Sequence, residues 1–312
     1  MVFFFSKGDH MKKDVKEFKT IEEQINILIS RNVLVDNENY AKALLVDVNY
    51  YNLMANRNLF EYDNQHNIFP KIIKIEDLAN VYFFNFDLRN FLFKCMSYIE
   101  SSIKTKIAYV HTSKYGPLGY KDVNNFVMSA KDIGDNGLTY HDEIMSSLSK
   151  EIDRSQEEYI TWHKNQYKDI PFWVAINKLS FGDMSKFYRL MIHSDKKAVA
   201  KYFNAGPLQI EKWLWQFSVL RNVCAHQGNL IVWKYQSIPL DSEYDGMYIQ
   251  NTFFQYIIAL FLLINCDHVM CQFIEDLLSL LKKYGTTHLK DLGIPDKYED
   301  DLLNLNLLHT LY

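Results

Sequence analysis

Apolar residues recur at helical spacing along most of this chain, and this periodicity constrains the fold more than any other feature. Residues 76–111 show a long pattern of this kind, with an interruption near Asn85 as an open alternative. Glycine (11) and proline (6) are scarce among 312 residues, which argues against the many turns of a β-sandwich or barrel. The sequence therefore predicts an all-α, bundle-like fold.

Further helices are predicted from capping signals and apolar spacing. Thr20 is followed three residues later by Glu23, a pair typical of a capping box, so a helix is expected over 21–30. Pro171 is well placed to open a helix, which we expect Gly182 to interrupt. Other helices are expected at 40–45, 141–165, 208–233 and 247–284. We expect one domain over residues 15–285, an extension or expression remnant at 1–14 and a peripheral tail at 286–312.

Composition and charge exclude several classes of protein. Hydrophobic residues make up 48% and charged residues 23%, with a net charge of −4, so the chain has the material for a core and is not predominantly disordered. The most apolar segment, 253–266, is shorter than the roughly 20 residues that span a bilayer, and predicts a buried core helix. With no readable signal peptide, we expect a cytoplasmic protein that does not enter a membrane.

The four cysteines do not indicate a disulfide framework or a metal site. None forms a C-x-x-C pair. Cys266 and Cys271 flank His268, but a second pair of ligands is missing nearby, which disfavours zinc. We therefore expect reduced, mostly buried thiols, no metal and no cofactor.

The segment 213–233 (WLWQFSVLRNVCAHQGNLIVW) holds the most informative side chains. At about 100° per residue, one apolar stripe is formed by Trp213, Phe217, Leu220 and Cys224. Asn222 and His226 form an i, i+4 pair on nearly the opposite side, with Arg221 between the two faces and Trp215 and Val219 beside the pair. We therefore expect a helix over about 208–227 that is buried on two sides, with Arg221, Asn222 and His226 in one seam.

A charged arginine in a packed seam is costly unless an anion accompanies it. One interpretation is structural: Arg221 pairs with a carboxylate such as Glu100, and His226 is hydrogen-bonded in the core. The other interpretation is a phosphate site, because arginine offers a planar fork of donors, asparagine a neutral donor and histidine a proton acceptor. The grouping of the three within six residues, just before a helix end at Gly228, favours the phosphate site.

The hexapeptide RNVCAH (221–226) resembles the R-x4-6-H signature of the HEPN superfamily in its RN-x-x-AH form. The chain around it, roughly 15–235, resembles the abortive-infection (Abi-like, AbiD/AbiF type) branch of bacterial phage-defence proteins. The blocks that carry this likeness, in order, are DVNYYNL (47–53), FDLRNFLF (86–93), YIESSIKTKIAY (98–109) and IPFWVAINKLSFGDMSKFY (170–188). One departure is Asn229, where the family often has a basic residue.

This resemblance implies a HEPN-type helical bundle, with additional N- and C-terminal helices, that acts as a homodimer. It implies a metal-independent endoribonuclease whose composite site takes Arg221, Asn222 and His226 from each copy, with the RNA 2′-OH as nucleophile. Such an enzyme is toxic when active, so its activity has to be controlled. The controlling agent is open among a noncoding RNA, an antitoxin protein and a phage-triggered signal. Other readings are a non-catalytic RNA-binding module in a ribonucleoprotein, which Asn229 and the acidic charge favour, and an interaction protein whose motif fixes a dimer interface.

Two stretches, 88–121 and 178–201, are locally basic in this acidic chain. If they converge, they make a groove for the RNA backbone, and the candidates are Lys104, Lys106, Lys186 and Arg189. The alternative is that the cations of these two stretches lie on ordinary solvated helix faces and form no RNA-binding groove. For Glu100 two roles are open: pairing with Arg221, to hold the guanidinium in place, or an i, i+4 pair with Lys104.

Overall fold

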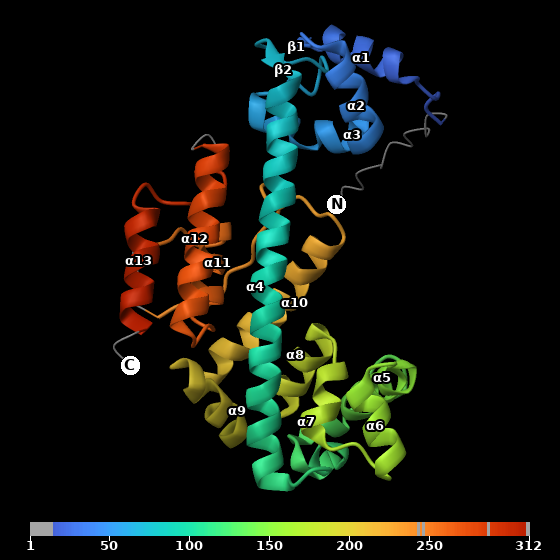
Figure 1. Cartoon of the computed structure of the whole chain (residues 1–312), viewed down its shortest axis with the longest axis vertical. Coiled ribbons are helices and arrows are strands. Elements are labelled where there is room, and N and C mark those ends of the chain that lie inside the picture. The colour runs from blue at the N-terminus through green and yellow to red at the C-terminus, as the bar shows by residue number, and fades with distance from the viewer. Residues whose placement is uncertain (1–14, 242–243, 245–246, 286–287, 310–312) are drawn as a thin grey trace, which may run out of the picture. The chain divides into compact units, whose positions relative to one another are not determined.

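The computed structural model describes residues 15–241, 244, 247–285 and 288–309 (Figure 1). The chain divides into two compact units, Met1–Phe83 (unit 1) and Phe84–Tyr312 (unit 2). The helix α4 (Ile75–Tyr115) begins in the first and continues in the second as one uninterrupted helix. The prediction of a single domain over 15–285 placed no boundary at Phe83.

Unit 1 is a small helical unit with one minimal sheet. Its elements are α1 (Ile21–Ser30), β1 (Val33–Leu34), α2 (Glu38–Val48), α3 (Tyr50–Leu53), the 3-10 helix η1 (Met54–Phe60) and β2 (Ile73–Lys74). β1 and β2 pair in parallel, with Val33 opposite Ile73. Leu28, Leu53 and Phe69 are fully buried at the centre of its core.

The start of α1 confirms the predicted capping box. The Thr20 hydroxyl accepts a hydrogen bond from the Glu23 backbone N–H at 3.2 Å, and the Glu23 carboxylate accepts one from the Thr20 backbone N–H at 2.8 Å. Two backbone donors that the helix itself leaves unpaired are satisfied in this way.

Unit 2 is built from helices alone in the part of the chain that the structure describes, which confirms the predicted all-α class. After α4 come η2 (Gly119–Lys121), η3 (Val123–Asn125), η4 (Met128–Lys131), α5 (Tyr140–Arg154), α6 (Glu158–Gln166), α7 (Phe172–Ala175), η5 (Ile176–Lys178), α8 (Phe181–Leu190), α9 (His193–Ala200), η6 (Lys201–Phe203), α10 (Pro207–Ala225), α11 (Phe253–Phe261), α12 (Asp267–Tyr284) and α13 (Tyr298–His309). α10 packs against α8 and α9, and α12 packs against α13.

Several predicted helix boundaries are wrong. α4 runs through Asn85 without a break. The segments 141–165 and 247–284 each form two helices rather than one, and the helix expected to 233 ends at Ala225. Gly182 lies inside α8; the interruption falls just before it, where the Ser180 hydroxyl accepts the Asp183 backbone N–H at 3.0 Å and starts a new helix. The capping side chain of Ser180, and not Gly182, therefore sets this helix boundary.

The apolar segment around α11 lies in the interior, as predicted, because every residue of Phe253–Phe261 is buried. A search of the described helices finds none with the length and apolar character needed to cross a membrane. Beyond residue 287, Leu292, Ile294 and Leu302 are also buried, so the segment expected to be a peripheral tail contributes to the interior of unit 2.

Candidate functional site

Helix α10 carries the motif and is anchored by one apolar face. Pro207 opens it, and the Gly206 backbone N–H donates to the Gln209 side-chain oxygen at 3.0 Å. The predicted stripe is confirmed, since Trp213, Phe217, Leu220 and Cys224 are all buried. The Trp213 indole N–H also donates to the Pro239 carbonyl at 2.7 Å, which fixes the rotation of the helix.

The opposite face of α10 is exposed, so the prediction of burial on two sides is wrong within one chain. Trp215 is 48% exposed, Asn222 and His226 are exposed, and Arg221 is half-buried. Trp215, Asn222 and His226 are spaced by 7 and 4 residues and therefore share one helix face. The motif side chains thus lie at the surface, where a second macromolecule can reach them.

Arg221 has neutral neighbours. Its guanidinium lies over the Phe93 ring of α4, 5.5 Å from the ring centroid, and its Nη1 is 3.4 Å from the Asn222 Oδ1. Stacking on a ring orients the guanidinium without neutralising its charge. No carboxylate pairs with Arg221 among the residues that the structure describes. Its positive charge therefore remains available to an anion.

The chain leaves α10 through a Schellman turn directly after the motif. His226 is the C-cap residue, and Gln227 follows with φ = 58°, in the left-handed region. The Gly228 N–H donates to the Val223 carbonyl at 2.7 Å, and the Gln227 N–H to that of Cys224 at 3.4 Å. A Cβ on Gly228 would lie 2.4 Å from the Val223 Cγ1, so only glycine fits at this position. His226 is thereby held at a defined helix end.

Two side chains of α4 hold the turn in place. Asn85 Oδ1 accepts the Leu230 backbone N–H at 2.8 Å, while the Asn85 amide and the Arg89 guanidinium both donate to the Gly228 carbonyl, at 3.4 and 3.2 Å. Both side chains are buried. The sequence analysis missed this role: it considered a break near Asn85 and counted Arg89 only among the cations of the basic stretch 88–121. The only sequence signal was that the block FDLRNFLF, within 86–93, includes Arg89.

Of the two roles open for Glu100, the structure places it with Lys104. The Lys104 Nζ donates to the Glu100 carboxylate at 2.6 Å and to the Leu179 carbonyl at 2.5 Å, and the lysine is only 6% exposed. The alternative pairing of Glu100 with Arg221 is not formed. Lys104 therefore lies in the interior and has no surface to offer RNA.

The other three predicted RNA contacts lie in two places. The Lys106 Nζ donates to the Ser102 hydroxyl at 2.7 Å and lies 4.9 Å from the centroid of the Phe203 ring, and burial lowers its pKa. Lys186 and Arg189 of α8 meet α10 instead. With Lys212 and Trp215, they line a hollow of about 350 Å³ whose only acidic residue is Glu211. Lys212 was not predicted, because its contribution depends on how α8 and α10 pack.

Several cations of the stretch 88–121 are neutralised by carboxylates distant in sequence. Lys94 pairs with Asp276 at 2.7 Å, Lys114 with Asp195 at 2.7 Å and Lys121 with Asp169 at 2.6 Å. The basic character read from local sequence is therefore largely removed by the fold.

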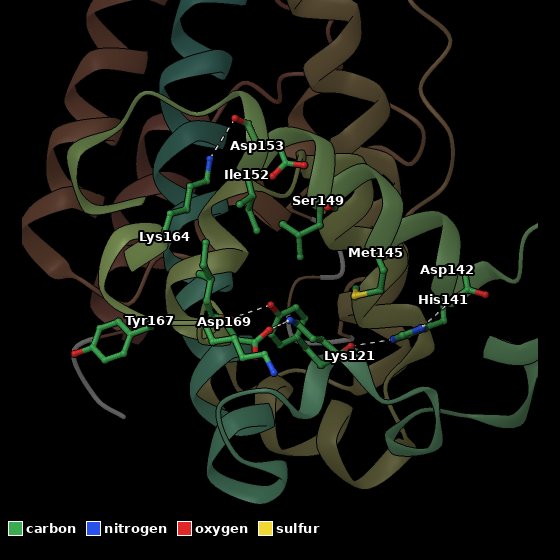
Figure 2. Close-up of a pocket in the computed structure, with 14 residues that line it drawn as sticks. Lys121, His141, Asp142, Met145, Ser149, Ile152, Asp153, Lys164, Tyr167 and Asp169 are labelled. Carbon is green, nitrogen blue, oxygen red and sulfur yellow. Dashed lines mark hydrogen bonds and ion pairs between the residues drawn. The ribbon is translucent and has the colours of Figure 1, made fainter. Parts of the chain in front are cut away.

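A larger pocket of about 650 Å³ lies between α5 and the segment 164–170 (Figure 2). Its charged lining is balanced, with Lys121, Lys164 and Lys168 against Asp142, Asp153 and Asp169. The buried His141 has its Nε2 2.9 Å from the Tyr120 carbonyl, and burial raises the pKa of Tyr120 to about 12. Because the charges balance and these polar groups have internal partners, the lining gives no preference for an ionic ligand.

No cluster of three or more histidine, cysteine, aspartate or glutamate side chains among the described residues is arranged to hold a metal ion. Cys95 and Cys224 are buried, and burial raises the pKa of the Cys224 thiol to about 12. Cys266 is exposed and Cys271 is half-buried. The cysteine within the motif, Cys224, is thus a protonated core residue rather than a nucleophile.

Comparison with known proteins relates the chain to a protein family. A protein family described as "Abi-like protein" matches residues 43–232, which is more than half of the chain and ends after the motif helix and its turn. No curated protein and no solved structure matches the chain.

Proposed function

We propose, from the premise that the chain belongs to the Abi-like protein family, that it is a metal-independent endoribonuclease. The family points to abortive-infection phage defence. Within it, we assign RNA cleavage to a site formed by Arg221, Asn222 and His226 at a homodimer interface of the HEPN type. The observation that carries the proposal is the exposed motif face of α10, where an unneutralised arginine and a histidine lie together at a rigid helix end.

The need for two chains follows from the chemistry. Cleavage of RNA by its own 2′-OH requires a base to take the hydroxyl proton and an acid to protonate the leaving 5′-oxygen. One motif supplies one histidine, His226. Because the motif faces solvent, two copies of α10 can meet face to face and bring two such histidines to one phosphate.

In the proposed reaction a neutral His226 takes the proton of the 2′-OH, whose oxygen forms a new bond to the adjacent phosphorus. The P–O5′ bond breaks, and the protonated His226 of the partner subunit gives its proton to the departing 5′-oxygen. Arg221 stabilises the additional negative charge of the phosphorane-like transition state, and Asn222 contacts a non-bridging oxygen or orients His226. The products are a 2′,3′-cyclic phosphate and a 5′-OH.

The hollow beside Trp215 supports an RNA path along α10. Lys186 pairs with Glu143 at 2.9 Å, so Arg189 and Lys212 are the cations that favour phosphate groups there, and the half-exposed Trp215 ring can stack on an unpaired base. Trp215 and His226 are separated by 11 residues, roughly 16 Å along the helix axis. A strand bound at the motif could therefore extend to this hollow.

A non-catalytic RNA-binding module in a ribonucleoprotein is the second candidate. Asn229 favours it, because its side chain accepts the Ile231 backbone N–H at 3.2 Å and shapes the loop, where the family often has a basic residue. In this case Arg221 and His226 would grip an RNA partner, such as a regulatory noncoding RNA, without cutting it. An antitoxin protein remains the alternative restraint on the nuclease.

The test is cleavage of a mixed single-stranded and structured RNA in EDTA by the parent protein, His226→Ala, Arg221→Ala and a control, His268→Ala. His268 is exposed on α12 and lies outside the motif. We expect cleavage with cyclic-phosphate ends by the parent and the control alone. Cleavage by His226→Ala at the parent rate would refute the assignment. Tight, salt-sensitive RNA retention by the parent without cleavage would favour the binding module.

A further inference from the structure

Unit 1 contains a cavity of about 820 Å³ that none of the preceding roles uses. One wall is the segment 16–19, which precedes α1, and others come from Arg31 at the end of α1, from 49–54 around α3 and from Arg57, Tyr62 and Asn67. It includes the tyrosines of DVNYYNL, a block that the proposed cleavage does not employ. Its volume is in the range of pockets that take small molecules.

The lining of this cavity, here called the unit 1 pocket, is strongly basic. Four cationic side chains, Lys16, Lys19, Arg31 and Arg57, accompany one carboxylate, Glu17. Lys19 pairs with Glu17 at 3.4 Å and with Glu23 at 3.5 Å, so the excess positive charge comes from the other three. This contrasts with the net charge of −4 of the whole protein and with the balanced lining of the pocket in Figure 2. Cations concentrated in a cavity of an acidic protein favour an anionic ligand.

The two arginines of the pocket have neutral partners. The Arg31 Nη1 donates to the Tyr50 hydroxyl at 2.5 Å, and Arg57 donates to the Met54 carbonyl at 3.3 Å. Both arginines are half-buried, and neither pairs with a carboxylate among the described residues. Burial raises the pKa of the Tyr50 hydroxyl, and the positive charges of Arg31 and Arg57 both oppose that rise. Both guanidinium groups therefore act on the Tyr50 hydroxyl. Two converging, unneutralised guanidinium groups suit a phosphate.

Aromatic rings lie beside these charges. Tyr51 is 65% exposed and stands edge-on to Tyr50, with ring centroids 5.5 Å apart. The Lys16 Nζ lies 5.8 Å from the Tyr51 ring centroid, and the exposed part of the ring remains available to a stacking partner. Tyr62 is only 7% exposed, and its hydroxyl has no hydrogen-bond partner among the described residues. A buried, unpaired hydroxyl is costly, and a polar ligand would supply its missing partner.

Phosphate-binding arginines and an exposed ring for stacking together fit one class of ligand. We propose that the unit 1 pocket is a nucleotide-binding site, in which Arg31 and Arg57 hold a phosphate group and Tyr51 stacks on the base. The nucleotide is either free or part of an RNA strand, because both present the same phosphate and base. The site is independent of the proposed cleavage, since every residue assigned to it belongs to unit 1.

The test measures binding rather than cleavage. Isothermal titration calorimetry of the full chain with AMP and with inorganic phosphate would compare the parent, the Arg31→Gln/Arg57→Gln double variant, Tyr51→Ala and a control, Lys42→Gln/Lys71→Gln. The control removes the same charge from exposed side chains of unit 1 that do not line the pocket. A second arm follows the fluorescence anisotropy of a labelled single-stranded oligoribonucleotide on the His226→Ala protein, with and without the pocket substitutions.

We expect the double arginine variant to bind AMP about tenfold or more weakly, while the control binds like the parent. Tyr51→Ala should weaken AMP binding about tenfold and leave phosphate binding unchanged. Loss confined to the RNA arm supports the site with a strand as the ligand, whereas loss of AMP binding supports a free nucleotide. The proposal is overturned if the arginine variant matches the control in both arms, or if phosphate binds as tightly as AMP and Tyr51→Ala has no effect.

Discussion

Replacing Asn85 by alanine tests whether α4 holds the turn that follows the motif. In the parent, Asn85 Oδ1 accepts the backbone N–H of Leu230, a residue that is fully buried. Alanine leaves this N–H without a partner, which costs about 1–3 kcal/mol. The Gly228 carbonyl keeps its Arg89 donor, so it adds little to the cost. The substitution also raises helix propensity, which returns about 0.6 kcal/mol.

The control is Asn90→Ala, five residues along the same helix on an exposed position. It makes the same chemical change and gains the same helix propensity, but breaks no contact with the turn. The free energy of unfolding of Asn85→Ala should therefore lie about 1–3 kcal/mol below that of Asn90→Ala. The difference between the two variants isolates the hydrogen bond to Leu230.

Urea denaturation followed by tryptophan fluorescence is a suitable assay, because all five tryptophans lie after Phe83 and report on unit 2. RNA cleavage at 25 °C, where both variants are folded, should also fall in Asn85→Ala, since His226 lies two residues before Gly228. Equal unfolding free energies for the two variants would show that the Asn85 contact contributes no stability, and the argument for a rigid motif end would fail.

Three further predictions concern single side chains. Gln227→Gly should raise the unfolding free energy by about 1 kcal/mol, or the melting temperature by about 2–4 °C, because glycine adopts the left-handed conformation without strain; a lower melting temperature would contradict this. Burial lowers the pKa of His111 to about 4, against about 6.5 in the unfolded chain, so the unfolded state binds more protons at acidic pH. The free energy of unfolding should therefore fall by about 3 kcal/mol as the pH drops from 6.5 to 4. In His111→Leu this part of the pH dependence should vanish, and an unchanged slope would exclude His111 as its source. Lys104→Met should cost about 2–3 kcal/mol by leaving Glu100 and the Leu179 carbonyl without their donor, yet RNA affinity of the folded protein should not change; a weakened affinity would mean that Lys104 reaches RNA after all.

The parts of the fold that the sequence predicted well depend on residues close together in the chain. Thr20 and Glu23 form their capping box within one helical turn, and the apolar stripe of α10 from Trp213 to Cys224 is a matter of helical spacing. The breaks between α5 and α6, and between α11 and α12, were missed. The first break falls in the polar run 153–158 (DRSQEE), where Ser155 is extended, and the second follows the apolar run that ends at Cys266, which is also extended.

The contacts that hold the candidate site in place could not be predicted from local sequence, for a different reason. Asn85 and Arg89 contact Gly228 across 143 and 139 residues of sequence, so no window of sequence contains both partners. Basic stretches of the sequence mislead for the same reason. Lys94 is neutralised by Asp276, and Lys114 by Asp195, only once the chain has folded. Sequence spacing placed Arg221, Asn222 and His226 at one helix end, but could not tell a face buried in the same chain from a face left for a partner.

The direction of α10 explains why the motif depends on its side chains. A helix N-terminus binds phosphate with its backbone N–H groups and the positive end of its dipole. The motif lies at the other end, where the last carbonyls carry partial negative charge and repel a phosphate. The Schellman turn pairs the carbonyls of Val223 and Cys224 and reduces that repulsion. In the proposed ribonuclease, attraction for a phosphate would then come from Arg221, and a second arginine from a second copy would double it, which is the physical case for proposing a site completed by two chains.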